Sequence, residues 1–371
     1  MALSRIDTTN MIEDVPQSKL DNNINFRNII INGDMSIAQR ATSVSSISSG
    51  ATYNTIDRMR FGVNSLGTWT QSQSTDVPTG QGFAKSFKLN CTTADASPGA
   101  GDYVFLNYNI EGQDLQYLKK GTANAESLTL SFWTKSNKTG TYTFELDDND
   151  NSRSFSQTYT ISSANTWEKK TITFAGDTTG SLDNDNNNSL RFYFWLGAGS
   201  NYTSGTLQTS WQSTTDANRV SSSNVNLADS TSNEWYITGV QLEAGEVASD
   251  FEFLPTDVNL QRCQRYYYKS YEIGTAVPTS TFNSCIGRFL SSSNAAYASL
   301  QLPTVRLRAS PTTTIYNPLT NATASLRSDS TNHPAAVESI NSNGGGWVYS
   351  NGSTVSGNTS CRIHFTFEAE L

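Results

Sequence analysis

Residues 235–245 read WYITGVQLEAG, and far earlier in the chain residues 27–35 read RNIIINGDM. Between these two stretches lies a series of short segments in which apolar and polar residues alternate, separated by Gly, Asn and Asp. Alternation with a period of two is typical of half-buried β-strands. We therefore interpret the two stretches as the last and first strands of one β-sandwich, with the first strand over residues 29–32.

The segments between these two stretches give the positions of the other expected strands. Residues 128–135 read LTLSFWTK and give the clearest strand pattern. Short strands at regular spacing with turn residues between them indicate a sandwich. One short helix is expected at residues 111–118. The other expected strands cover residues 57–62, 67–72, 86–91, 103–110, 140–146, 154–161, 166–174 and 189–196.

The composition changes after FEFLP at residues 251–255. Residues 259–270 predict a helical turn that leads into a strand, and further strands are expected at 311–316 and 362–371. We predict an all-β protein in three parts. These are an extended N-terminal anchoring arm (1–26), a jelly-roll β-sandwich (27–257) and a smaller C-terminal β-sandwich (258–371).

Composition and charge exclude several classes of function. Charged residues make up 16% of the chain, against about 25% in ordinary soluble proteins, and Ser, Thr and Asn replace them. A net charge of −8 argues against nucleic acid as a partner, because phosphate neutralisation needs clustered Lys and Arg. No apolar run is long enough to cross a bilayer. The first residues lack the apolar segment of a secretory signal, so we expect folding in a cytoplasm without membrane insertion.

Four motifs resemble the strands of jelly-roll carbohydrate-binding modules. They are INGDM (31–35), SFWTK (131–135), NTWEK (165–169) and YITGVQLE (236–243). Together with RCQRYY (262–267) and RASPT (308–312) the string is similar to virion proteins of marine bacteriophages, usually described as tail-fibre or minor structural proteins. The resemblance covers roughly residues 27–320.

The resemblance implies a homotrimeric virion component, assembled in the host cytoplasm and docked on other virion proteins by its N-terminal arm. We expect a tail fibre or spike that contacts host-surface polysaccharide. A capsid decoration or knob protein without essential sugar binding is the alternative, because no long coiled-coil shaft is visible in the sequence.

The same modules commonly hold a structural calcium ion between the opening turn and an acidic residue of the closing strand. Here Thr238 and Gly239 stand where that acid is expected. Asp34 and Glu243 remain the candidate ligands, and a hard cation needs six or more oxygens. We therefore expect no cofactor, with calcium at these two residues as the alternative.

Catalytic residue types are sparse. The chain has two histidines, His333 and His364, no Gly-x-Ser-x-Gly elbow and no evident pair of carboxylates for glycoside hydrolysis. Cysteines occur at 91, 263, 285 and 361 without metal-ligand spacing, and we expect reduced thiols, with a pair between Cys263 and Cys285 as the alternative. We expect a protein that is not an enzyme, and a glycan-cleaving enzyme is the less favoured class.

Glycan binding needs aromatic rings for stacking and polar groups for the sugar hydroxyls. Rings in or beside polar loops are the candidates for stacking: Trp69, Tyr202 and Trp211, with Trp211 the most exposed. Hydrogen bonds would come from Asn201, Gln212 and Asp216. Tryptophans within expected strands are typical of the core, which assigns Trp133, Trp167, Trp195 and Trp235 to the interior.

Overall fold

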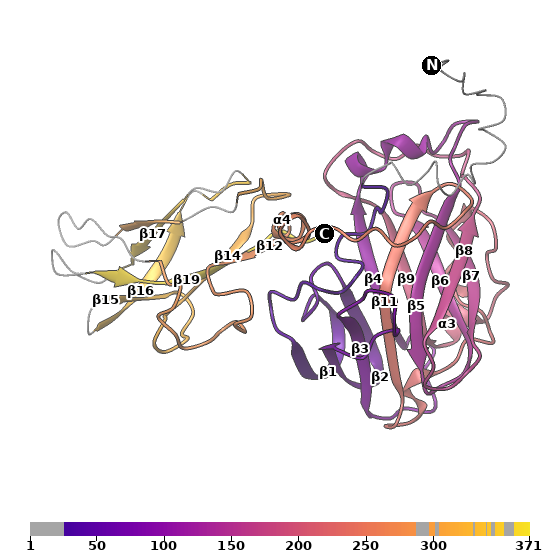
Figure 1. The fold of residues 1–371 in the computed structure, drawn as a ribbon, viewed down its shortest axis with the longest axis horizontal. Helices are drawn as coiled ribbons and strands as arrows, with labels where there is room; N and C mark the ends of the chain where they lie inside the picture. The colour runs from indigo at the N-terminus through magenta and orange to yellow at the C-terminus, as the bar shows by residue number, and fades with distance from the viewer. Residues whose placement is uncertain are drawn as a thin grey trace, which may run out of the picture.

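The computed structural model describes residues 26–286, 297–300, 304–328, 331–338, 340–342, 346–351 and 360–371. Within these residues nearly all regular structure is antiparallel β-sheet, in one large curled sheet and two small ones (Figure 1). The predicted all-β class is therefore confirmed. The predicted arm, residues 1–26, lies outside the described residues except for Phe26. None of the helices in the described part is of a length and apolarity that would cross a bilayer.

The large sheet runs in the order β10-β7-β6-β9-β4-β2-β3-β11-β5-β8, with β1 paired to β2. Its strands are β1 (Ser43–Thr52), β2 (Arg60–Ser74), β3 (Ser86–Thr93), β4 (Tyr103–Glu111), β5 (Leu128–Ser136), β6 (Gly140–Asp148), β7 (Arg153–Ile161), β8 (Glu168–Phe174), β9 (Asn188–Ala198), β10 (Gln212–Ser213) and β11 (Glu234–Ala244). Three short helical segments, α3 (Ser200–Thr203), η4 (Asp216–Asn218) and η5 (Leu227–Asp229), lie between β9 and β11.

The long strand β2 folds this sheet into two layers. Its first half pairs with β4 and its second half with β3, and the backbone between them turns through positive φ at Ser65 and Gly67. The first layer is β7-β6-β9-β4 with the start of β2, and the second is the end of β2 with β3-β11-β5-β8. Most connections after β3 cross between the layers, which is the winding of a jelly roll.

Aromatic rings from both layers fill the space between them. Phe194 of β9 meets Phe132 of β5 with ring centroids 5.0 Å apart, and Phe155 of β7 meets Phe174 of β8 at 4.9 Å. Edge-to-face pairs of this kind add about 0.5–1.5 kcal/mol each beyond the burial of their surface. The rings therefore form the core between the two layers.

Strands β3 to β9 and β11 are close to where the sequence predicted them. The two strands expected at 57–62 and 67–72 are halves of the single strand β2. The expected helix at 111–118 consists of two 3-10 turns, η2 (Gly112–Asp114) and η3 (Gln116–Leu118). The Ser-rich β1 was not predicted, because most of its side chains are exposed and show no alternation.

The prediction of a first strand at residues 29–32 is wrong. The segment consists of turns and irregular backbone, in which Asn28 accepts hydrogen bonds from the Ile30 and Leu242 amides at 2.9 and 3.1 Å. An asparagine that bonds nearby backbone competes with a strand ladder. The two quoted stretches nevertheless meet, since the Val240 amide donates to the Gly33 oxygen at 2.9 Å, in the bulge of β11.

The remaining chain forms two small sheets, β12-β19-β14 and β13-β17-β16-β15-β18. The predicted helical turn that opens onto a strand is α4 (Thr256–Gln264) followed by β12 (Tyr267–Lys269). The other strands are β13 (Tyr297–Ser299), β14 (Thr312–Tyr316), β15 (Ser325–Ser328), β16 (Thr331–Glu338), β17 (Trp347–Ser350), β18 (Cys361–Arg362) and β19 (His364–Glu368). Buried Ile315, Val348, Phe365 and Phe367 belong to their common core.

Arg58 joins the sandwich to these C-terminal elements. Its guanidinium lies 3.5 Å from the ring centre of Tyr266 and 4.9 Å from that of Tyr108, and it forms an ion pair with Glu370. Arg40 reaches the same carboxylate at 3.3 Å and Glu368 at 2.6 Å. In Figure 1 the C-terminal end and α4 lie between the sandwich and the small sheets. The junction is therefore ionic and largely buried.

Replacing Arg58 tests how much this junction stabilises the protein. Arg58→Met keeps a long side chain but removes the positive charge beside the buried Glu370 carboxylate. Breaking a buried ion pair from one side lowers the free energy of unfolding by about 3–5 kcal/mol. Lys119→Met is the matched control, because Lys119 and its partner Glu126 are 53% and 41% exposed, and such pairs contribute about 0–1 kcal/mol. The free energy of unfolding in urea measures both. Equal losses in the two variants would contradict the role of Arg58.

Candidate functional site

The prediction that Trp69 stacks on a glycan is wrong. The side chain is completely buried between the layers, its Nε1 donates to the Leu66 carbonyl at 2.8 Å, and its ring packs on Phe61. A ring without exposed surface cannot stack on a sugar. The alternating pattern of residues 67–72 predicts that Trp69 lies on a single face of the strand, and in the structure that face points into the core.

Asn201, Tyr202 and Asp216 do lie on one loop. This loop connects β9 to β11, and the Val220 amide donates to the Tyr202 carbonyl at 3.0 Å where it folds back. Asn201 and Asp216 are exposed, and Tyr202 is half-buried with its ring 5.4 Å from that of Trp195. The structure thus brings these three predicted residues onto the outer face of the first layer.

The β9–β11 loop covers the aromatic and charged side chains of that face and shields them from solvent. Arg219 of the same loop donates two hydrogen bonds to Glu145, at 2.8 and 3.1 Å, and Trp195 Nε1 donates a third at 2.9 Å. Burial raises the pKa of Glu145 although Arg219 opposes the shift. Trp195 is 1% exposed, so the rings below the loop offer no open surface.

Trp211 and Gln212 belong to the same connection between β9 and β11 but lie at the edge of the first layer, next to β7. Gln212 is exposed, but Trp211 is only partly so. The Trp211 ring packs on Phe155 with centroids 5.9 Å apart, and its Nε1 donates to the Ala175 carbonyl at 2.8 Å. Trp211 is thus partly exposed, as Tyr202 is, and its ring covers the end of the core.

Asp34 and Glu243 are both surrounded by hydrogen-bond donors. Asp34 accepts from Ser36 Oγ at 3.0 Å and from Asn259 Nδ2 at 3.1 Å. Glu243 accepts from the Ser249 amide and hydroxyl at 2.9 and 2.6 Å. Within the described ranges no group of three or more His, Cys, Asp or Glu has metal-site geometry. Calcium at Asp34 or Glu243 stays a prediction.

The histidines and cysteines lie in structural positions. His364 is buried, stacked 3.8 Å from Tyr271 and bonded through Nδ1 to Ser270 and through Nε2 to the Thr281 carbonyl. Burial lowers the pKa of His364, which keeps the ring neutral. A catalytic triad needs an acid on one ring nitrogen and a nucleophile on the other; here Ser270 bonds one nitrogen, but the other meets the Thr281 carbonyl and not an acid. The four cysteines are free thiols.

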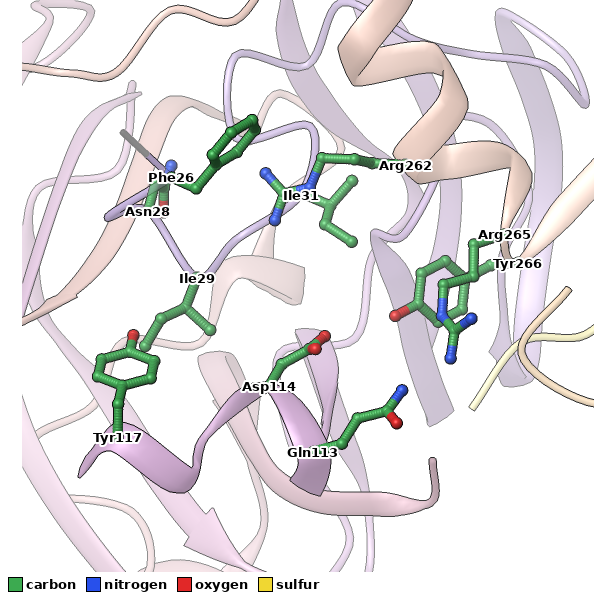
Figure 2. Close-up of a pocket in the computed structure, with 10 residues that line it drawn as sticks. All are labelled: Phe26, Asn28, Ile29, Ile31, Gln113, Asp114, Tyr117, Arg262, Arg265 and Tyr266. Carbon is green, nitrogen blue, oxygen red and sulfur yellow. The ribbon is translucent and has the colours of Figure 1, made fainter. Parts of the chain in front are cut away.

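A cavity of about 480 Å³ lies where the opening segment, the η2 and η3 turns and α4 meet (Figure 2). We call it the α4 pocket. Its rim carries two exposed rings, Phe26 at 58% and Tyr117 at 48%. Ile29 and Ile31 form part of the wall, and the polar lining groups are Asn28, Gln113, Asp114, Arg262, Arg265 and Tyr266.

Glu111 fixes the two sides of the α4 pocket relative to each other. Arg265, after the end of α4, donates two hydrogen bonds of 2.7 Å to this carboxylate, and the Tyr266 hydroxyl donates another. Gln113 donates to it from the turn side at 2.6 Å. Burial disfavours the charge of Glu111, but these donors outweigh it and lower its pKa. The pocket walls are thereby held rigidly.

Two charged groups that line the α4 pocket have unused hydrogen-bonding capacity in the described part of the chain, although the Arg262 guanidinium lies 5.8 Å from the centre of the Phe26 ring. The Asp114 carboxylate forms neither a hydrogen bond nor an ion pair there, and desolvation together with Glu111 raises its pKa. Arg262 Nη1 is buried without a hydrogen-bond partner among the same residues. Figure 2 shows Arg262 entering from α4 and Asp114 from the turn opposite. The pocket therefore presents one acceptor and one donor to a ligand.

Tyr117 adds a third polar group at the rim. Partial burial and the nearby Asp114 charge raise the pKa of Tyr117 to about 12, so its hydroxyl remains protonated at neutral pH. The hydroxyl can donate a hydrogen bond while the ring stacks. The arrangement can therefore bind a polar ring that carries several hydroxyl groups.

Sequence reasoning missed the residues of the α4 pocket and misplaced two tryptophans. Trp195 and Trp235 are in the core as expected, but Trp133 and Trp167 are half-buried on the outer face of the second layer. The signal for Trp133 was present, since Phe132 is inward and successive strand residues point to opposite faces. No local pattern links α4 to the η2 turn.

No protein-family model matches the chain, and no curated protein matches it in sequence. Among solved structures it is similar to the enzymatically active domain of bacteriophage CBA120 tailspike protein 4, at 14% identity and a TM-score of 0.31, over 59% of this chain and 21% of that one. The chain thus spans about a fifth of that tailspike chain.

A putative sugar-binding protein from Bacteroides thetaiotaomicron is 11% identical, over 58% of this chain and 99% of that one, with a TM-score of 0.33. A family 11 carbohydrate-binding module from Clostridium thermocellum, solved with a β-1,3-1,4-mixed-linked tetrasaccharide, is 9% identical over 56% and 98%, with a TM-score of 0.28. Likenesses at this level carry no argument about what this chain binds.

Trp211→Ala tests whether that side chain stabilises the sandwich. We expect the free energy of unfolding to fall by about 1–3 kcal/mol, because the ring covers Phe155 and its hydrogen bond is lost. Gln212→Ala, at the exposed neighbouring position, should change it by about 0.5 kcal/mol or less. Thermal unfolding of both variants gives the comparison, and an unchanged melting temperature for Trp211→Ala would restore it as an exposed binding residue.

Proposed function

We propose that this chain is a non-catalytic structural protein of a bacteriophage particle, a tail fibre or spike that binds host-surface polysaccharide in the α4 pocket. The observation that carries the proposal is the pair of opposite charges, Asp114 and Arg262, that line one pocket beside exposed aromatic rings and have hydrogen-bonding atoms without a partner in the described part of the chain. A sugar ring offers both hydroxyl donors and hydroxyl acceptors, and its C–H faces stack on aromatic rings.

The energetics favour a ligand of this kind. A buried polar atom without a partner costs about 1–3 kcal/mol, and a bound sugar would remove that cost at Arg262. The cavity of about 480 Å³ lies within the range of roughly 300–1,000 Å³ typical of small-molecule sites. Phe26 and Tyr117 would lose exposed apolar surface on binding, which adds to the affinity.

Binding without cleavage fits the lining of the α4 pocket. Glycoside hydrolysis uses two carboxylates on either side of the bond, about 5–9.5 Å apart. Among the described residues that line the pocket, Asp114 is the one carboxylate. Glu111 nearby is fully buried and bonded to Arg265 and Tyr266, so it does not serve as a second acid.

The particle role is supported by the sequence resemblance of residues 262–267 and 308–312 to phage virion proteins. Arg262, Arg265 and Tyr266, which line the α4 pocket, belong to the first of these motifs. In the proposed particle the chain is a homotrimer that docks on other virion proteins through its N-terminal arm.

Asp114→Asn tests the glycan site. We expect at least a tenfold loss of affinity, about 1.4 kcal/mol, because the amide presents one acceptor oxygen where the carboxylate presents two. Asp216→Asn is the matched control, an exposed carboxylate outside the α4 pocket, and should bind as the wild type does. Binding to purified surface polysaccharides of bacterial hosts is measured by calorimetry. A loss confined to Asp216→Asn would move the site to the β9–β11 loop, and no binding to any polysaccharide would refute the function.

The particle role has its own test. Gold-labelled antibody against this protein should mark the tail of purified phage particles, and light scattering of the isolated protein should give three chains. Labelling over the whole capsid would favour a decoration protein, and absence from the particle would contradict the virion assignment.

A further inference from the structure

A second cavity, of about 410 Å³, lies on the outer face of the second layer. We call it the Trp133 slot. Trp133 of β5 lines it together with Phe83, Phe251 and Phe253, whose rings pack on one another with centroids 4.8–5.1 Å apart. Lys169 and Asp250 supply charge to the lining. The slot thus combines aromatic and polar groups.

Two glycines make room for the phenylalanine rings. Gly239 has φ of +62°, and a Cβ there would lie 2.5 Å from the Phe83 ring. Gly82 has φ of +84°, and its Cβ would lie 3.2 Å from Phe253. Residues other than glycine seldom adopt such φ values. The cluster is therefore a defined wall, although Phe253 remains 49% exposed.

The charged groups of the slot are available to a ligand. Lys169 and Asp250 are both exposed, and neither side chain pairs with another residue in the described ranges. They carry opposite charges, so together they favour a neutral, hydroxyl-rich ligand over a strongly charged one. Trp133 lies across the β5–β8 pairing from Lys169, which places a donor beside the ring.

The chain segments that border the slot and the α4 pocket are hydrogen-bonded to each other. Residues 26–28 and 250–252 run side by side there, since Glu252 accepts from the Phe26 and Asn28 amides at 2.5 and 3.0 Å. Phe26 and Asn28 line the α4 pocket, whereas Asp250 lines the slot. One extended ligand can therefore reach both cavities by passing over residues 250–252.

We infer that the Trp133 slot is a second subsite for the same polysaccharide, in which a sugar further along the polymer stacks on Trp133. This inference rests on the proposed function. Occupation of two connected subsites raises affinity without new contacts in either one, because the second binding event is intramolecular. The slot would therefore add to the affinity for polymers and not to that for short fragments.

The experiment compares a host surface polysaccharide with its single-repeat fragment, by calorimetry on the full chain. Wild-type protein should bind the polymer at least tenfold more tightly per repeat than the fragment. Trp133→Ala should abolish that gain and leave fragment affinity unchanged, whereas Asp114→Asn should weaken both. Trp167→Ala is the matched control, since Trp167 is also half-buried on this face but bonds to Asp76 outside the slot.

The outcomes separate the two proposals. Fragment binding without a gain for polymer, a gain that survives in Trp133→Ala, or an equal loss in Trp167→Ala overturns the second subsite and leaves the proposed function intact. Failure of both fragment and polymer to bind overturns both. If Trp133→Ala does not fold, Phe253→Ser replaces it, because that ring is half-exposed and its loss should likewise remove the gain.

Discussion

The arrangement of the molecule depends on one buried cation, Arg58. Its guanidinium lies between the rings of Tyr108 and Tyr266, donates to the Asn109 carbonyl at 2.6 Å and pairs with Glu370. Burial disfavours its charge, but Glu370 and the tyrosines outweigh this and raise the pKa of Arg58. A buried ion pair is costly to break from one side. The sandwich and the C-terminal elements are therefore fixed to each other, and Tyr266 is fixed with them.

The position of Tyr266 determines the α4 pocket. Tyr266 and Arg265 follow the helix and bond to Glu111 at the end of β4, so α4 and the η2 turn face each other at a set separation. The pocket belongs to neither part alone, because its lining comes from residues 26–31, 113–117 and 262–266. A jelly-roll sandwich without its C-terminal neighbour would lack one wall of the site.

Much of the fold could be predicted from the sequence, but the site could not. Most strands from β3 to β9 alternate apolar and polar residues in the sequence, and that period is visible in a single sequence. The opening stretch looked like a strand because of its three isoleucines, but Asn28 satisfies the backbone locally. Which face of a strand points inward depends on the layer packed against it. Trp69 was therefore predicted to be exposed and is buried, whereas Trp133 was predicted to be buried and lies on the outer face. Asp114 and Arg262 come to line one pocket only through the fold. Arg262 lies in the motif RCQRYY, but neither that motif nor the sequence around Asp114 indicates a binding role.

The contrast between Glu145 and Asp114 explains why binding is better placed at the α4 pocket than on the outer face of the first layer. Glu145 is buried but receives hydrogen bonds from Arg219 and Trp195, so a ligand there would first have to break a satisfied ion pair. Asp114 and Arg262 line a cavity and still have hydrogen bonds to offer in the described part of the chain, which a ligand could accept or donate without breaking an ion pair. Arg262 Nη1 is already removed from water in the free protein, so a ligand that bonds to it does not add that desolvation cost to binding. The aromatic rings at the rim add apolar contact.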